Sequence, residues 1–485
     1  MDGMATVLTF ADLRPALAEI FVAAAACVIL LVDAFLPERR RGLTFILAIA
    51  ALAGAAWVTS IVATPDRTVT LYGHFVADPM GTVLKLFAYG AAAVSLLYSR
   101  DYLAKRGLMR GEYFVLALFA VLGIQVIVSA GSLLSLYMGI EIMSLSLYAM
   151  IAFDRDNGIA AEAAMKYFVL GAIASGTLLY GISILYGVTG TIRLDGLAEA
   201  VQGTDASGIG LLLGLAFIVV GVAFKFGAVP FHMWLPDVYH GSPTAVTLFV
   251  GSAPKIASFA LAIRLLAEGL GGAVDAWQDM LIVLAVLSMA IGNVVAIAQT
   301  NIKRMLAYST ISHVGFILLG VLAGNATGYQ AAMFYTLTYV ILATGAFGVV
   351  LLMSRKGFEA EWLDDYKGLN QKSPWFAFVM LLLMFGMAGV PPTVGFWAKV
   401  QVISAVLDVG FTWLAALAVV LSVIGAYYYL RIVKLMYFDE PVGREALEAG
   451  GAFRIVLSLN GLAVLALGLF PGLLIALCAQ VLPRL

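Results

Sequence analysis

The sequence predicts an all-α polytopic membrane protein with about 14 transmembrane helices, built on two inverted five-helix repeats whose helices 7 and 12 are discontinuous. Three observations predict this fold. The 485-residue chain is 62% hydrophobic and 12% charged, about half the charged fraction of a soluble domain. Apolar stretches of about 20 residues, the length that crosses a bilayer as a helix, recur along the chain. Two stretches exceed one span and contain prolines near their middles.

Hydropathy places these helices in order along the chain, with each boundary where an apolar run ends. The predicted spans are residues 14–36, 43–63, 77–99, 113–130, 132–153, 163–187, 207–238, 244–267, 277–299, 305–323, 328–353, 375–408, 411–436 and 453–480. The two long segments, 207–238 and 375–408, are interrupted by Pro230 and Pro236 and by Pro391 and Pro392. Proline removes an amide donor, and in lipid the freed carbonyl must be satisfied by protein or water.

Helices 4–8 and 9–13 each hold five spans with the broken helix in fourth place. Because five is odd, the second group starts on the opposite side of the membrane, as in transporters with inverted repeats. The predicted domains are an N-terminal three-helix segment (1–110), a first five-helix repeat (111–270), a second five-helix repeat (271–440) and a C-terminal helix (441–485).

The basic residues predict the orientation of the chain. One set of alternate loops carries 18 of the 28 lysines and arginines. The other set, with the termini, carries only Arg14, Arg67, Arg193, Arg264 and Arg484. Because loops rich in lysine and arginine stay on the cytoplasmic side, both termini are expected on the outer side.

Several function classes are excluded by composition and motifs. The net charge of −1 gives no basic surface for nucleic acid. Cys27 and Cys478 lie in apolar segments at opposite ends, so neither a disulfide nor a metal site is expected. No phosphate-binding loop, dinucleotide fingerprint, CxxC or HExxH is found. The longest polar loop, residues 354–374, is too short for a catalytic domain, and no cofactor is expected in this chain.

Charged residues inside the predicted spans are the strongest functional signal. They are Glu141, Lys166, Lys225, Lys255 and Lys399. A charge at the bilayer centre costs about 2.5–3.5 kcal/mol on insertion scales, so such residues usually bind or move ions. Lysine suits proton transfer because burial weakens its hold on the proton, whereas arginine stays charged. None of these buried sites is an arginine.

The positions of these charges indicate a chain near mid-membrane. Lys225 comes five residues before Pro230 and Lys399 seven residues after Pro392. Since the two broken helices run in opposite directions, both lysines are predicted at similar depth. Glu141 is interpreted as the partner of Lys225. A functional pair is favoured over a structural one, because a buried ion pair alone contributes little stability.

Other ionisable residues are ambiguous. Lys166, about one turn inside a helix start, has either a functional role or a head group that reaches the interface. His313 is either a proton relay or a hydrogen-bonded core histidine. His232 and His240 flank the first break and could serve proton uptake. Lys85 is interpreted as an anchor near an outer helix end, and Glu19 and Asp33 as interfacial residues.

Four segments carry a family resemblance. KFGAVPFHMWLPDVYHGSPT (225–244), EAAMKYFVLGA (162–172), NIKRMLAYSTISHVG (301–315) and AGVPPTVGFWAKV (388–400) resemble the antiporter-like membrane subunits of bacterial respiratory complex I. The related Mrp-type cation/proton antiporters share these motifs. The resemblance covers about residues 110–440. Within the family, Lys399 in helix 12 and the absence of a long lateral extension mark one branch.

The resemblance implies a function and a set of roles. Glu141, Lys225, Lys255 and Lys399 match the family's proton-transfer residues, with Lys399 toward the outlet. The implied protein is a proton-translocating subunit of NADH:quinone oxidoreductase, with no cofactor of its own. NADH, FMN, iron–sulfur clusters and quinone are implied in partner subunits. The implied partners are other membrane subunits in a bacterial inner membrane, with both termini periplasmic.

Two other hypotheses remain open from the residues themselves. The chain could be a subunit of a sodium/proton antiporter of the Mrp type without redox coupling. It could also be a structural scaffold whose buried charges only pair with one another. Sodium exchange in liposomes supports the first alternative, and normal pumping after paired neutral replacement supports the second.

Overall fold

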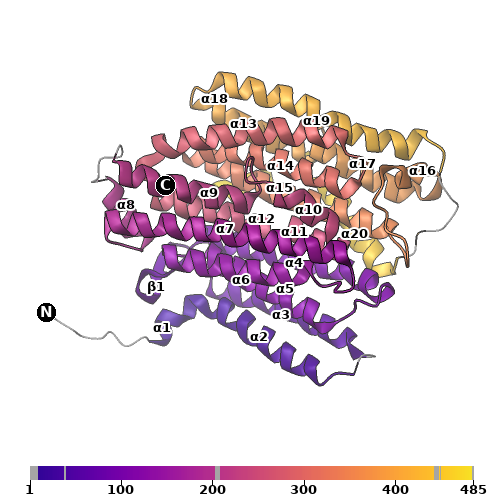
Figure 1. Cartoon of the computed structure of the whole chain (residues 1–485), viewed down its shortest axis with the longest axis horizontal. Helices are drawn as coiled ribbons and strands as arrows, with labels where there is room; N and C mark the ends of the chain where they lie inside the picture. The colour runs from indigo at the N-terminus through magenta and orange to yellow at the C-terminus, as the bar shows by residue number, and fades with distance from the viewer. Residues whose placement is uncertain (1–8, 38–39, 203–207, 442–446, 448, 483–485) are drawn as a thin grey trace.

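The computed structural model describes residues 9–37, 40–202, 208–441, 447 and 449–482. Its helices lie side by side along one direction, with α8 and β1 toward one end of the bundle and α16 toward the other (Figure 1). Thirteen helices in the described residues are long and apolar enough to cross a membrane. The predicted all-α membrane fold is therefore confirmed.

The N-terminal segment consists of three long helices and a short hairpin. Its elements are α1 (Phe10–Leu13), η1 (Arg14–Ala16), α2 (Leu17–Ala34), α3 (Gly42–Val62), β1 (Thr68–Thr70), η3 (Leu71–Gly73), β2 (Phe75–Ala77) and α4 (Pro79–Lys105). Strands β1 and β2 are antiparallel, with Val69 opposite Val76. Asp78 caps α4 by accepting a 2.7 Å hydrogen bond from the Gly81 amide, as expected for an aspartate that precedes a helix beginning with proline.

The first group of core helices contains the first interrupted span. It comprises α5 (Gly111–Val128), α6 (Leu133–Ile151), α7 (Gly158–Thr189), α8 (Leu194–Gln202), α9 (Ile209–Phe226), α10 (Trp234–Gly241), α11 (Thr244–Gly251), α12 (Ala253–Ala262) and the π-helical segment η4 (Ile263–Gly269). The predicted boundary at Ala130–Gly131 falls in the gap between α5 and α6. The predicted single helix at 244–267 contains a kink at Ser252, where α11 meets α12.

The second group contains the other interrupted span. It comprises η5 (Gly271–Ala273), α13 (Val274–Ala298), α14 (Ile302–Leu322), α15 (Ala326–Met353), η6 (Leu363–Tyr366), α16 (Leu369–Lys372), α17 (Pro374–Ala388), α18 (Val394–Asp408) and α19 (Thr412–Phe438). The predicted last helix, 453–480, is divided into α20 (Gly451–Leu469) and α21 (Gly472–Val481). Pro471 lies at this division and cannot continue the hydrogen bonding of a helix.

Both helix breaks have the same local design. Helix α9 ends before Gly227 and α17 ends before Gly389, whose φ angles are 78° and 83°. Glycine adopts this left-handed conformation without steric cost, and it commonly ends helices in this way. The chain then passes through a proline turn into α10 or α18. Helices α9 and α10 correspond to the predicted span 207–238, and α17 and α18 correspond to the predicted span 375–408. Helices 7 and 12 are therefore discontinuous, as predicted.

The centre of the bundle is formed by four helices from the two core groups. Helices α11, α12, α14 and α15 are almost wholly buried, whereas α2, α3, α7 and α20 each expose an apolar face. Close helix contacts depend on glycine, because there is no room for side chains between the backbones. A Cβ at Gly123 of α5 would lie 2.4 Å from the Met143 amide of α6. Likewise, a Cβ at Gly292 of α13 would lie 2.6 Å from the Ser312 amide of α14.

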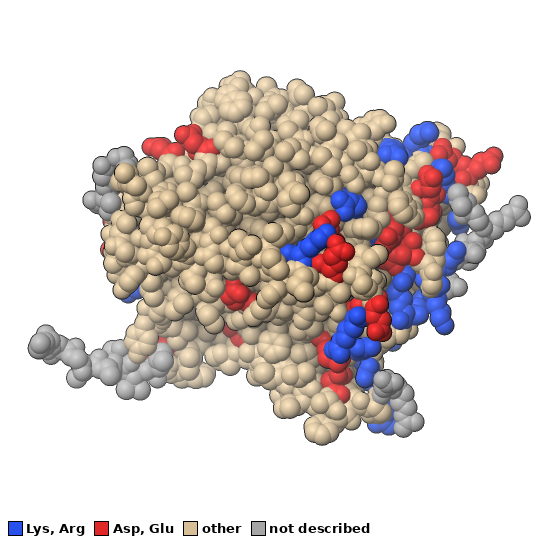
Figure 2. All heavy atoms as spheres, viewed as in Figure 1, with Lys and Arg blue, Asp and Glu red and all other residues tan. Residues whose placement is uncertain are grey.

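Charged residues on the visible surface gather at the end of the bundle that includes α16, which we call the basic end (Figure 2). We call the opposite end, with β1 and β2, the hairpin end. Most of the remaining visible surface carries no charge. Arg39, Arg444 and Arg484, which contribute to the predicted orientation, lie outside the described residues.

Arg264 corrects the prediction that placed it among the basic residues of the outer loops. Its side chain is 0% exposed, and Nη1 contacts Asp78 Oδ2 and Glu268 Oε1, each at 2.6 Å. Hydropathy assigns Arg264 to an outer loop because its helix was expected to end nearby. The π-helical turns of η4 continue the helix and bring the two carboxylates around the guanidinium.

Candidate functional site

The C-terminus of α9 forms one half of the site. The last carbonyls of a helix lack partners inside the helix and need donors from elsewhere. Three side chains supply them: Trp234 Nε1 donates to Phe224 O at 3.1 Å, Ser258 Oγ to Lys225 O at 3.1 Å, and Lys255 Nζ to Phe226 O at 2.8 Å. The break in helix 7 is therefore held by α10 and α12, and Lys255 binds the last carbonyl of α9.

Lys255 lies in a protein-lined environment with an aromatic ring and a helix C-terminus beside its ammonium group. The residue is 3% exposed. Its Nζ lies 5.7 Å from the centroid of the Trp234 ring, within range of a cation–π contact. It also faces the C-terminus of α9, where the helix dipole places partial negative charge. Loss of the proton would replace the charge-assisted hydrogen bond to the Phe226 carbonyl with a weaker neutral one, so protonation of Lys255 is linked to the geometry of the break.

The break in helix 12 repeats this arrangement. Lys399 Nζ donates to Ala388 O, the last carbonyl of α17, at 2.8 Å and to Ser422 Oγ at 2.8 Å. It lies 5.0 Å from the centroid of the Phe316 ring. Both Lys255 and Lys399 therefore bind the terminal carbonyl of a half-helix and stand over an aromatic ring.

Lys225 contacts a serine on the helix of Glu141 that the sequence analysis missed. Lys225 Nζ donates to Ser144 Oγ at 2.8 Å, and Glu141 lies close enough for its charge to act on this lysine. Glu141 Oε1 is buried and has no hydrogen-bond partner among the described residues. The lysine thus contacts a hydroxyl rather than the predicted carboxylate. Ser144 lies three residues after Glu141, the spacing that places both on one helix face.

His313 lies in a cluster of hydroxyl groups. Its Nδ1 is 2.7 Å from Tyr335 Oη and its Nε2 is 3.0 Å from Tyr429 Oη, which in turn is 2.5 Å from Ser309 Oγ. Phe316, which contacts Lys399, is three residues after His313 on α14. The cluster lies near Lys399, and its tyrosines were missed because single tyrosines in apolar helices carry no distinctive pattern.

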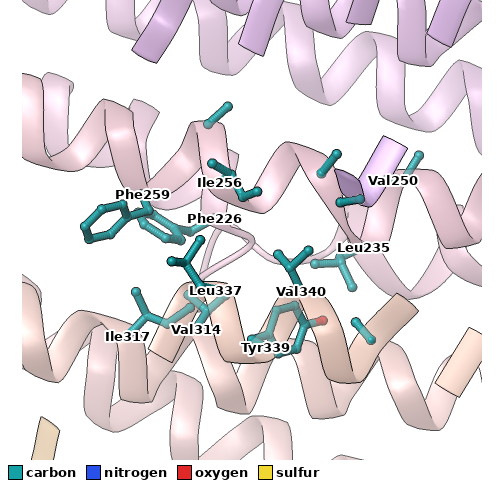
Figure 3. Packing of buried hydrophobic residues seen from close by; sticks show 14 of the residues in the cluster. Phe226, Leu235, Val250, Ile256, Phe259, Val314, Ile317, Leu337, Tyr339 and Val340 are labelled. Carbon is teal, nitrogen blue, oxygen red and sulfur yellow. The ribbon is translucent and has the colours of Figure 1, made fainter. Parts of the chain in front are cut away.

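A packed apolar layer lies between α12 and the helices that carry the hydroxyl cluster. In Figure 3, Ile256 and Phe259 lie opposite Val314, Ile317 and Leu337. All five are 0–1% exposed. Ile256 directly follows Lys255, and Val314 directly follows His313. The apolar layer therefore lies between Lys255 and the hydroxyl cluster around His313.

Lys166 is not gathered into the buried site. Its side chain is 45% exposed and pairs with Glu162 at 2.8 Å and Asp237 at 2.9 Å. Because α7 begins at Gly158, Lys166 lies two turns inside the helix rather than the predicted one. Such a pair on an exposed face contributes little stability.

The histidines beside the first break lie toward the basic end. His240 lines a polar cavity of about 470 Å³ with Lys303 and Glu361, and its Nε2 is 3.7 Å from Glu361 Oε2. His232 is 8% exposed, and its Nδ1 has no hydrogen-bond partner within the described part of the chain. Lys303, predicted as a loop residue, is 1% exposed and donates to Ser242 O at 2.9 Å.

Lys85 and Glu19 are a buried ion pair, and the predictions of an anchor and an interfacial acid were wrong. Their side chains are 7% and 10% exposed, and Nζ lies 2.5 Å from Oε1. The prediction failed because hydropathy locates α2 and α4 without showing which faces pack together. Asp33 accepts a 2.5 Å hydrogen bond from Thr44 Oγ1 across α2 and α3.

The described residues contain no group of three or more His, Cys, Asp or Glu residues that could hold a metal ion. Cys27 is exposed, Cys478 is buried, and both are free thiols. The polar groups of the site are thus amines, hydroxyls, an imidazole and a carboxylate, which can accept and donate protons.

Comparison with known proteins identifies the family. The model described as "NADH:quinone oxidoreductase/Mrp antiporter, TM" matches residues 130–425. The NADH-quinone oxidoreductase subunit N of Thiobacillus denitrificans is 58% identical over 474 residues, covering 98% of each chain. That of Nitrosomonas europaea is 54% identical over 466 residues, covering 96% of this chain and 97% of its own. The chain belongs to the NADH-quinone oxidoreductase subunit N family.

Solved structures agree with this assignment. A chain of respiratory complex I from Thermus thermophilus with bound aureothin is 32% identical, with a TM-score of 0.82 and coverage of 95% of this chain and 99% of that one. A chain of the Mrp complex from Dietzia has a TM-score of 0.85 at 23% identity, which shows the shared fold alone; coverage is 98% and 97%. The family resemblance and its branch are confirmed, and the chain is a multi-pass membrane subunit of an NADH-quinone oxidoreductase.

Proposed function

We propose that this subunit moves protons across the membrane through Glu141, Lys225, Lys255 and Lys399, driven by redox chemistry in other subunits. The observation that carries the proposal is the paired arrangement of Lys255 and Lys399. Each ammonium bonds the terminal carbonyl of a half-helix at 2.8 Å inside the bundle. Each amine can lose its proton and is hydrogen-bonded to a helix break. The protonation state of the amine is therefore linked to the conformation of the break.

The transfer steps follow from the hydrogen bonds. A change at Glu141 alters the field at Lys225, which passes its proton through Ser144 and water toward Lys255. Transfer onward to Lys399 requires water to enter the apolar layer around Phe259 and Leu337, because hydrocarbon side chains conduct no protons. Dewetting of such a layer is a known gate in membrane proteins. His313 and its tyrosines relay the proton beside Lys399, which releases it.

Proton uptake is assigned to the basic end. The cavity beside His240 is lined by charged groups from several helices, including Lys303 and Glu361. Its position next to α10 supports access to the first break. Lys166 contributes a surface ion pair to this region rather than a step in the chain.

We also assign the domains, orientation and partners by inference. Two five-helix units, 111–270 and 271–440, follow the N-terminal segment 1–110, and residues 441–485 complete the chain. The matching glycine contacts of α5 with α6 and of α13 with α14, and the matching breaks, support this repeat. The basic end faces the cytoplasm of a bacterial inner membrane, with both termini periplasmic. NADH, FMN, iron–sulfur clusters and quinone belong to partner subunits, and neighbouring membrane subunits pack on the apolar faces.

Replacement of the first pair tests the proposal. Glu141→Gln and Lys225→Met nearly preserve volume but remove titration. In complex reconstituted in liposomes, both should lower NADH-driven proton movement and quinone reduction, while NADH oxidation by an artificial acceptor stays at the wild-type rate. Lys367→Ala, a partly exposed residue paired with Asp364 at 3.0 Å, is the control. Wild-type pumping in both core variants would contradict the proposal. Sodium exchange driven by an imposed pH gradient, without NADH, would favour the Mrp-type alternative.

A further inference from the structure

A second buried acid–base pair lies outside the proposed chain, in the N-terminal three-helix segment. Lys85 of α4 and Glu19 of α2 are 2.5 Å apart, with side chains 7% and 10% exposed. Lys85 is six residues from the start of α4, or about 9 Å along the helix axis from the hairpin end. Buried pairs contribute little to stability compared with apolar packing, so the pair calls for another explanation.

Polar groups extend the pair into the first core helix. Tyr89 lies one turn after Lys85 on α4, and its hydroxyl is 3.0 Å from Thr59 Oγ1. Gln125 Nε2 of α5 donates to the same hydroxyl at 2.6 Å. Glu19 Oε2 and Gln125 Oε1 have no hydrogen-bond partners in the part of the chain that is described. Buried acceptors of this kind are usually satisfied by water.

A small cavity next to Lys85 has room for such a water. Its volume is about 10 Å³, and Lys85, Asp78, Thr59 and Ser129 line it. Ser129 is 1% exposed, and among the described residues its Oγ has no hydrogen-bond partner. A polar cavity holds one water at about this volume when several polar groups surround it. Lys85, Asp78 and Ser129 meet this requirement.

Charged residues connect the cavity with the surface at the hairpin end. Asp78 binds Arg264 at 2.6 Å, and Arg264 binds Glu268 at 2.6 Å. Glu268 also binds Arg67 at 3.1 Å, and the Arg67 side chain is 39% exposed. The series of alternating charges therefore runs from the buried pair to solvent. Arg264 also belongs to the same helix run as Lys255, which places the series beside the core.

We propose that Glu19 and Lys85 form a second proton-exchange site, which exchanges protons with the hairpin end through water in the Asp78–Ser129 cavity. A proton that reaches the Glu19 carboxylate gives the carboxylic acid beside the Lys85 ammonium. The ammonium then releases a proton to the cavity water, and the lysine amine is reprotonated by the acid. The inference rests on the proposed function, because a pump must release protons on the hairpin side.

Three variants separate exchange from structural pairing, each measured in the assembled complex in liposomes. Glu19→Gln with Lys85→Met removes both charges and nearly keeps the volumes. Lys85→Arg keeps the ion pair but holds its proton at working pH. Thr44→Val removes the hydrogen bond to Asp33 in the same three-helix segment and reports the effect of looser packing alone. The readout is the rate of NADH-driven acidification, with NADH oxidation by an artificial acceptor as the measure of intact redox subunits.

The exchange site predicts that the double variant Glu19→Gln/Lys85→Met and the single variant Lys85→Arg each lower acidification about a hundredfold, the lower end of the range for a lost proton-transfer group. Thr44→Val should pump at the wild-type rate. A wild-type rate in Lys85→Arg would overturn the inference, since it would show that pairing alone suffices. An equal loss in Thr44→Val would also overturn it. If the complex with Glu19→Gln and Lys85→Met fails to assemble, the pumping rate of Lys85→Arg still tests the inference. Normal pumping in these variants together with failure in Lys225→Met would remove only this inference and leave the proposed function.

Discussion

The ammonium group of Lys255 donates a 2.8 Å hydrogen bond to the carbonyl of Phe226, the last residue of α9. This contact joins a titratable side chain to the broken end of a helix. The contact of Lys399 with Ala388 repeats it in the second half of the chain. The protonation of each lysine therefore sets the strength of its hydrogen bond to a freed carbonyl, which is about 1.5–3 kcal/mol for a charged donor and about 0.5–1.5 kcal/mol for a neutral one.

Ser144 should be required for loading Lys225. Ser144→Ala removes the acceptor of the 2.8 Å hydrogen bond that Lys225 donates to the helix of Glu141. We expect proton-coupled quinone reduction to fall about tenfold. Ser146→Ala, on the same helix and bonded to Ile142 O at 2.8 Å, is the matched control. Equal rates in the two variants would show that Ser144 is only a helix-packing residue.

Tyr335 should support the function of His313. Tyr335→Phe removes the hydroxyl 2.7 Å from Nδ1 without changing the ring. The expected result is slower NADH-driven acidification with an unchanged amount of assembled complex, because the imidazole loses one partner in proton transfer. Tyr98→Phe is the control, since the Tyr98 hydroxyl is buried with no hydrogen-bond partner in the described residues. A loss confined to Tyr98→Phe would contradict the assignment.

The apolar layer should prevent passive proton flow. Leu337→Ser introduces a hydroxyl into this layer, where Leu337 is 0% exposed. Water attracted by the hydroxyl should raise the proton leak of liposomes that contain the complex in the absence of NADH. Leu351→Ser, about four turns away on the same helix, changes the same residue type outside the layer. If both variants leak equally, general loosening of α15 is the cause.

Arg264 should be a large contributor to stability. Arg264→Met leaves Asp78 as a buried carboxylate without its ion-pair partner and Glu268 with Arg67 alone, and a broken buried pair costs about 3–5 kcal/mol. The thermal transition of the purified complex should fall, or the assembled yield should drop. Arg193→Gln is the comparison, because Arg193 pairs with Asp195 on the surface, where the side chains are 50% and 41% exposed. Such a pair contributes only about 0–1 kcal/mol. Similar transitions for the two variants would contradict the buried network.

Local chemistry made much of this protein predictable from sequence. Proline and glycine act on their own backbone, so Pro230 and Pro392 revealed the two broken helices. The high cost of charge in hydrocarbon revealed Lys225, Lys255 and Lys399 without any knowledge of packing. These features depend on one segment at a time, which is why a single sequence carries them.

Contacts between distant segments explain what was missed. The burial of Lys85 depends on Glu19 of another helix, and the burial of Arg264 depends on Asp78, which is 186 residues earlier. Ser144, Tyr335 and Tyr429 are ordinary residues of membrane helices, and only their positions beside Lys225 and His313 give them a role. No period or motif in the chain shows those positions.

The most direct measurement of the central claim is proton pumping by Lys255→Arg in the complete complex in liposomes. Arginine keeps a donor and a positive charge near the Phe226 carbonyl but does not release its proton. If Lys255 transfers protons, the complex should assemble and oxidise NADH with an artificial acceptor normally, while NADH-driven acidification is lost. Acidification at the wild-type rate would show that Lys255 only closes the end of α9, and would contradict proton transfer through this residue.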